Sequence, residues 1–125
     1  MSKEGVSSIK VRFLIGEVGE AEAELIRYFA PRTVGAIARS LPIEGQVARW
    51  KEEVYFEIPL KMGEEKPESK VEQGAIAYWP MGNAICVFHG ETQPYSPVNI
   101  VGKVTKNLHL FKQTKSGARI TLEKI

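Results

Sequence analysis

The stretch GAIAYWPMGNAICVFHGETQP, residues 74–94, decides the fold class, because it contains most of an uncharged run that forms either one membrane span or two strands. The run extends from Gln73 to Gly90, and its eighteen residues are enough to cross a bilayer as a helix. Pro80 removes a helical hydrogen-bond donor, and the pair Gly82-Asn83 favours a turn. We therefore expect two short strands joined by a turn, and no membrane span.

Further strands are predicted wherever apolar and polar residues alternate with a period of two. The clearest alternation occurs at residues 9–15, 21–25, 45–50, 53–58, 98–104 and 118–125. For residues 21–25, the helical propensity of Ala and Glu leaves a helix as the competing interpretation. With the two strands of residues 74–79 and 84–88, this gives about eight strands with mostly short connections. That pattern predicts a mainly β protein, as a closed barrel or a sandwich.

One long helix is predicted at residues 31–41. Pro31 suits the first helical turn, and Val34, Ile37, Ala38 and Leu41 recur at helical spacing. A short helical turn is expected at residues 108–111, and the charged residues 61–73 are expected to form a loop.

Composition predicts one domain, residues 1–125, because 125 residues with 43% hydrophobic content can bury an independent core. Cys86 is the only cysteine, which excludes an intramolecular disulfide and fits a reducing compartment. The polar start shows no signal-peptide pattern, so we expect a cytoplasmic protein. All fifteen acidic residues are glutamate, and this Lys/Glu enrichment with few amides is typical of heat-adapted proteins.

Charge is distributed unevenly along the chain. Residues 92–125 carry a net charge of +5, and residues 1–91 carry −3. The lysines of the basic segment are scattered among apolar strand positions, which favours a solvated surface. A nucleic-acid-associated protein is the least favoured alternative, because no aromatic-basic signature accompanies the charge.

Three segments of the chain resemble the cyclophilin-like fold, and in particular a family of short prokaryotic cyclophilin-like proteins without an established function. They are WKEEVYFEIP at residues 50–59, YWPMGNAICVFHGET at 78–92 and VNIVGKV at 98–104. The resemblance implies a closed eight-stranded barrel with one main helix and a short helical turn. True cyclophilins bind a proline peptide on the outer face of the barrel, where an arginine donates a hydrogen bond to the prolyl nitrogen during isomerisation.

Carried onto this chain, the resemblance implies a groove with Arg49 at the position of the catalytic arginine. Tyr55 and Glu57 are expected to face the same groove, while Val54 and Phe56 point into the barrel. Alternation along residues 84–89 similarly places Ile85, Val87 and His89 inside. The complete set of candidate ligand-binding residues is Arg49, Trp50, Tyr55, Glu57, Trp79, Cys86 and Phe88.

Each candidate also has a plain structural interpretation. The aromatic residues are suited to packing against the barrel, Arg49 to an ordinary surface position and Cys86 to a packed thiol. Gly102 inside a strand indicates a bulge or a close backbone approach, and Asn99 is a candidate for fixing a loop or a ligand by its amide.

Several kinds of chemistry are excluded by the residues present. Cys86 and His89 fall on opposite faces of one strand, so they form no catalytic pair. Two histidines, one cysteine and no aspartate give no metal-ligand spacing, and no glycine-rich phosphate loop occurs. We therefore predict no metal and no cofactor. The leading hypothesis is a protein that binds a peptide or small molecule, and the alternative is a weak peptidyl-prolyl isomerase that uses Arg49.

Overall fold

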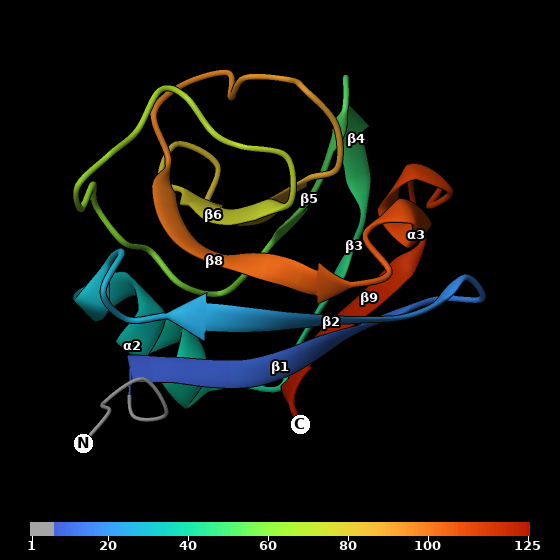
Figure 1. The fold of residues 1–125 in the computed structure, drawn as a ribbon, viewed down its shortest axis with the longest axis horizontal. Helices are drawn as coiled ribbons and strands as arrows, with labels where there is room; N and C mark the ends of the chain where they lie inside the picture. The colour runs from blue at the N-terminus through green and yellow to red at the C-terminus, as the bar shows by residue number, and fades with distance from the viewer. Residues whose placement is uncertain (1–6) are drawn as a thin grey trace.

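The computed structural model describes residues 7–125, in which nine strands form one antiparallel sheet (Figure 1). The run at residues 73–90 forms a hairpin, as predicted. No helix in this part of the chain is both long and apolar enough to span a membrane. The elements are β1 (Ser8–Ile15), β2 (Gly19–Ile26), α2 (Pro31–Ser40), β3 (Ile43–Gln46), β4 (Ala48–Trp50), β5 (Glu53–Glu57), β6 (Ala75–Trp79), β7 (Ala84–Phe88), β8 (Asn99–Lys106), α3 (His109–Lys112) and β9 (Arg119–Lys124).

The sheet curls into a nearly closed barrel because its two edge strands are consecutive in the chain. The strand order is β3-β9-β1-β2-β8-β6-β7-β5-β4. Only Val47 separates β3 from β4, and its backbone N–H and carbonyl bond to Ala118 and Gly117 at 2.8 and 2.7 Å. One segment, residues 43–50, therefore pairs with β9 through its first half and with β5 through its second half. This division explains why nine strands are observed where eight were predicted.

The interior of the barrel is a single apolar cluster. Val54, Phe56, Ile85 and Val87 all belong to it and are at most 1% exposed, as the alternation predicted. Phe13 makes edge-to-face contacts with Phe56 and Phe111, with ring centroids 6.4 and 5.2 Å apart. Burying a side chain of this size contributes about 1.5–3 kcal/mol, so the lumen supplies much of the stability.

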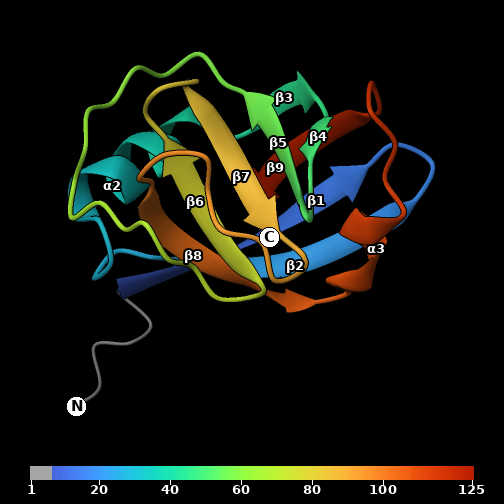
Figure 2. The ribbon, with the colours of Figure 1, turned by 90° about the horizontal axis from the view of Figure 1, so that it is seen from above.

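The two helices lie at opposite sides of the molecule (Figures 1 and 2). Helix α2 begins at Pro31, as predicted, and contributes Val34 and Ile37 to the core. Helix α3 contributes Phe111 from the other side. The barrel core is thereby covered by one apolar helix face at each of two sides.

The N-terminus of α2 is capped by a residue distant in sequence. The preceding residue, Ala30, has no side-chain cap to offer, and the Glu65 carboxylate instead accepts hydrogen bonds from the N–H groups of Arg32 and Thr33 at 3.0 and 2.8 Å. Asn99 holds this loop in place, because its amide oxygen accepts the Glu65 N–H at 2.8 Å and its amide nitrogen donates to the Gly63 carbonyl at 3.0 Å. The prediction that Asn99 fixes a loop is confirmed.

The strands β8 and β2 approach each other closely at Gly102. A Cβ at this position would collide with the backbone carbonyl of Glu24 in the neighbouring strand β2. The pairing of β8 shifts register against both β2 and β6 near this point. The predicted close approach is therefore confirmed, and the associated bulges help the sheet to curl.

We predict that Glu65→Ala lowers the free energy of unfolding by about 1–2 kcal/mol, because it leaves the α2 donors uncapped. Burial opposes ionisation of Glu65, but the hydrogen bonds from Arg32 and Thr33 outweigh it and lower the pKa of this carboxyl. The stabilisation is thus present at neutral pH and is lost as the pH falls through the pKa of Glu65 in the folded protein.

Urea denaturation of Glu65→Ala beside the exposed neighbour variant Glu64→Ala provides the measurement. Equal stability of the two variants at neutral pH would contradict the capping role.

Candidate functional site

A pocket of about 210 Å³ opens on the outer face of the barrel, over β5 and β7. Glu53 and Tyr55 of β5, which alternate with the barrel-facing Val54 and Phe56, contribute to its lining. We call it the outer pocket; its lining residues are Trp50, Glu53, Tyr55, Trp79, Cys86, Pro94, Tyr95 and Val98.

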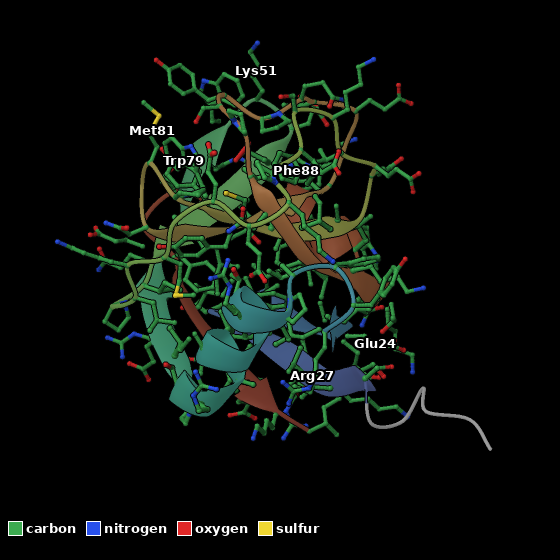
Figure 3. The ribbon with its side chains drawn as sticks, turned by 90° about the vertical axis from the view of Figure 1, so that its left-hand side faces the viewer. Glu24, Arg27, Lys51, Trp79, Met81 and Phe88 are labelled. Carbon is green, nitrogen blue, oxygen red and sulfur yellow. The ribbon has the colours of Figure 1, made fainter. Side chains whose placement is uncertain are left out.

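Four aromatic rings form a continuous arc around the outer pocket. Trp50 contacts Tyr95 with ring centroids 6.0 Å apart, and Tyr95 contacts Trp79 at 6.3 Å. Trp79 in turn contacts Tyr55 at 5.9 Å. The planes of adjacent rings are inclined by 79–89°, so neighbouring walls stand nearly perpendicular to one another. Figure 3 shows Trp79 at the end of the molecule away from Arg27.

Trp79 is oriented by the loop that also carries Tyr95. Its indole N–H donates to the Ser96 hydroxyl at 2.6 Å. Its ring lies against Gly82 in the β6–β7 turn, where a Cβ would collide with it. The loop is held in turn by the segment before β6, since the Val71 N–H donates to the Gln93 side chain at 2.8 Å. The loop that carries Tyr95 and the segment before β6 lie at the top of Figure 1.

Among the residues that the structure describes, Glu53 is the one charged residue that lines the outer pocket. It is 5% exposed, and burial raises the pKa of its carboxyl to about 7, although a hydrogen bond with the Cys86 thiol opposes the shift. Burial and the neighbouring Glu53 also raise the pKa of Cys86 well above its usual value. The pocket therefore contains a carboxyl group that titrates near neutral pH and a thiol that stays protonated.

Four of the seven predicted residues come together here: Trp50, Tyr55, Trp79 and Cys86. Glu57 points to the same side of β5 but lies exposed at the strand end, outside the pocket. Phe88 belongs to the apolar cluster of the outer face and is fully buried, so its ring is not part of the lining.

The expected orientation of Arg49 is wrong. Arg49 pairs with Val54 across the β4–β5 hairpin, and directly paired residues point to the same side of a sheet. It therefore lies on the barrel side, opposite to Tyr55. Its Nη1 donates to the carbonyls of Phe111 and Thr114 at 3.0 and 2.6 Å, which attaches α3 to the barrel.

His89 lies beside Arg49, away from the outer pocket. Its Nε2 is 3.3 Å from Arg49 Nη2, while its buried Nδ1 has no hydrogen-bond partner and lies 3.8 Å from the Glu52 carboxylate. Burial, with a smaller effect of Arg49, lowers the pKa of His89 and favours the neutral ring. Cys86 is on the other face, so the two residues do not form a catalytic pair, as expected.

A second, larger hollow of about 550 Å³ lies beside Tyr28 and Phe29. Its lining mixes lysines and glutamates and contains none of the predicted site residues. Within residues 7–125, no group of three or more His, Cys or Glu side chains is placed to hold a metal ion. The outer pocket is therefore the candidate site.

We predict that Glu53→Gln changes the pH dependence of stability. Between pH 4.5 and about 7 the folded wild type retains a proton that the unfolded chain has released, so its free energy of unfolding falls as the pH rises through this window. Glu53→Gln has no carboxyl at this position, so its free energy of unfolding does not fall in this way. The stability of the variant relative to wild type should therefore increase by about 1–2 kcal/mol from pH 4.5 to pH 8.

Urea denaturation at both pH values checks this prediction. The matched control is Glu57→Gln, an exposed position on the same face of β5, four residues further along the chain. A constant difference between wild type and Glu53→Gln at the two pH values would show that the carboxyl does not titrate in this window.

Comparisons with known proteins support the same fold class as the observed barrel. The profile of the cyclophilin-like family matches residues 9–123. Among solved structures, the hypothetical protein AF2241 from Archaeoglobus fulgidus is 34% identical, with a TM-score of 0.80, and the match covers 95% of this chain and 96% of that one. McbB in complex with tryptophan shares the fold at 14% identity and a TM-score of 0.79, over 91% of this chain and 44% of McbB.

No curated protein matches the chain at a significant level. The sequence resemblance is nevertheless confirmed, because the family profile spans nearly all of the described barrel and AF2241 matches it from end to end. The chain belongs to the cyclophilin-like family.

Proposed function

We propose that this protein binds a small molecule, or a single side chain of a peptide, in the outer pocket. The observation that carries the proposal is the convergence of four aromatic rings around one nearly buried carboxyl group. The volume of about 210 Å³ lies below the roughly 300–1,000 Å³ of sites for drug-sized ligands. The expected ligand is therefore small, or enters with one group only.

The origin of the lining residues supports recognition rather than simple packing. The rings come from β4, β5, β6 and the loop before β8, and the side chain of Tyr95 stays 69% exposed at the rim. Tyrosine and tryptophan are enriched at binding surfaces, because they combine a large apolar face with a polar group. McbB was solved with tryptophan bound, which makes indole a reasonable first probe for this fold.

The geometry favours binding over prolyl isomerisation. An isomerase of the cyclophilin type needs a cation on the outer face, and the guanidinium of Arg49 is instead bonded to two carbonyls at α3. Within residues 7–125, no arginine or lysine lines the outer pocket. The isomerase alternative therefore lacks the residue on which it depended.

We predict that Arg49→Ala acts on stability. Hydrogen bonds from a charged donor are worth about 1.5–3 kcal/mol, so the variant should lose about 2 kcal/mol or more of unfolding free energy. Urea denaturation measures the loss, with Arg119→Ala as the control because the Arg119 side chain is 75% exposed. The same preparations, assayed on an X-Pro peptide, should show no isomerisation that depends on Arg49. A stable Arg49→Ala protein that had lost isomerase activity would contradict this assignment.

Ligand binding itself is tested by titration with indole, benzoate, choline and the dipeptide Ala-Pro. Both tryptophans of the chain line the outer pocket, so intrinsic fluorescence reports on this site for benzoate, choline and Ala-Pro. Indole is itself fluorescent, so its binding is followed by the backbone resonances of pocket residues. We expect at least one probe to bind, and Tyr55→Ala to weaken that binding by about tenfold, or 1.4 kcal/mol.

The control is Tyr28→Ala, which removes an exposed tyrosine from the second hollow. The proposal fails if none of the four probes perturbs the fluorescence or the backbone resonances of Cys86 and Val98 at millimolar concentration. It also fails if Tyr28→Ala and Tyr55→Ala weaken binding equally.

A further inference from the structure

We infer that the outer pocket recognises an organic ammonium ion, with the Glu53 carboxylate as the counter-ion and the faces of the four aromatic rings as the surrounding walls. This inference rests on the proposed function and specifies the chemical class of the ligand. It is carried by two independent features, the unpaired carboxylate and the arrangement of the rings.

Glu53 lacks the partner that a buried carboxylate requires. It is 5% exposed, and no Lys, Arg or His of residues 7–125 lies within ion-pair distance of it. The Glu53 carboxyl forms a side-chain hydrogen bond with the Cys86 thiol, which is a weak donor. Removing a carboxylate from water without a counter-charge is unfavourable, so the group must take up a proton or a cation. Below about pH 7 the carboxyl takes up a proton, and above this pH a bound cation would supply the missing counter-charge.

The rings offer the second feature. The face of an aromatic ring carries partial negative charge, and cations bind within about 6 Å of its centroid, most strongly over tryptophan. Two tryptophans and two tyrosines surround the pocket with adjacent planes nearly perpendicular. Walls with different inclinations enclose the space from several directions, and we infer that ring faces are among the surfaces that they offer. This arrangement suits the substituted nitrogen of an ammonium ion, whose charge is spread over its alkyl groups.

Trp50 already makes a contact of this kind within the chain. The ammonium group of Lys51 lies 4.7 Å from the centroid of the Trp50 ring. Lys51 is exposed and does not line the outer pocket, so it does not neutralise Glu53. The contact shows that this ring accepts a cation on a face.

Other ligand classes fit the pocket less well. An anion would be repelled by Glu53 above pH 7. A neutral aromatic molecule would fill the space but leave the carboxylate dehydrated and unpaired. Calcium needs six to eight oxygen ligands, and the pocket supplies one carboxylate. Only an organic cation satisfies both the carboxylate and the ring faces.

The experiment compares choline with 3,3-dimethylbutan-1-ol, which has the same shape without the charge. At pH 8 we expect choline to bind at least about tenfold more tightly than the alcohol, as measured by tryptophan fluorescence. Glu53→Gln should weaken choline binding by about tenfold or more and change binding of the alcohol by less than about twofold. Because the variant removes a buried charge, it should remain folded, which urea denaturation checks. Tyr95→Leu should weaken choline binding several-fold, while Tyr28→Leu should leave it unchanged.

The pH dependence gives a readout that a merely structural role of Glu53 would not produce. Choline keeps its charge from pH 5.5 to pH 8.5, so any change in affinity reports on the protein. The titratable groups that face Glu53 are Cys86 from β7, Tyr55 from its own strand and Tyr95 from the loop before β8. Of the acidic side chains in the described part of the chain, only Glu53 lies in the pocket. Wild-type affinity should therefore fall by about tenfold between pH 8.5 and pH 5.5, and that of Glu53→Gln should stay constant.

The possible outcomes separate this inference from the proposed function. Tighter binding of choline than of the alcohol, lost in Glu53→Gln, supports both. Binding of indole or the alcohol with equal or weaker binding of choline overturns the ammonium assignment and leaves a pocket for a neutral ligand. Choline binding that is unaffected by Glu53→Gln or by pH also overturns the role of Glu53. Failure of every probe overturns the inference together with the proposed function.

Discussion

The double pairing of residues 43–50 is the constraint on which the rest of the structure depends. Because this one segment bonds to β9 and then to β5, the sheet has to curl until its two ends meet. Curling turns the two faces of every strand into an inside and an outside. Val54 and Phe56 enter the lumen, and Glu53 and Tyr55 are left on the outer surface. The outer pocket is therefore a consequence of barrel closure together with the loops that lie over the outer face.

The sequence predicted those features that follow from periodicity. Alternation along β5 and β7 assigned Phe56 and Val87 to the core and Tyr55 and Cys86 to the opposite face, because the side-chain period of a strand is two. Register between strands does not follow from periodicity. Strand β4 has only three residues, so the turn at Lys51 and Glu52 determines how β4 pairs with β5. This turn places Arg49 opposite Val54. That pairing turned the expected groove arginine into an anchor for α3.

Glu53 and Tyr95 were missed for two different physical reasons. Glu53 shares the face of Tyr55 and Glu57, so its direction was predictable from the alternation. A charged side chain is normally expected to be exposed. Glu53 is buried because the loop that carries Tyr95 lies over β5. Tyr95 belongs to a segment without periodicity, whose path depends on distant contacts such as the hydrogen bond from Trp79 to Ser96. Loop residues of this kind gain their positions from tertiary contacts that no local pattern encodes.

Two glutamates of this fold, Glu65 and Glu53, have opposite effects on its stability. Glu65 lies where N–H donors converge, its pKa is lowered, and its charge stabilises α2. Glu53 has no Lys, Arg or His of residues 7–125 within ion-pair distance, its pKa is raised by burial, and its ionised form destabilises the folded state. A fold selected for stability alone gains nothing from a carboxylate at position 53, since a glutamine there would avoid the buried charge. An unpaired acid among four aromatic rings is understandable if its counter-charge comes from a ligand, because a bound cation then offsets the destabilisation that the buried carboxylate causes.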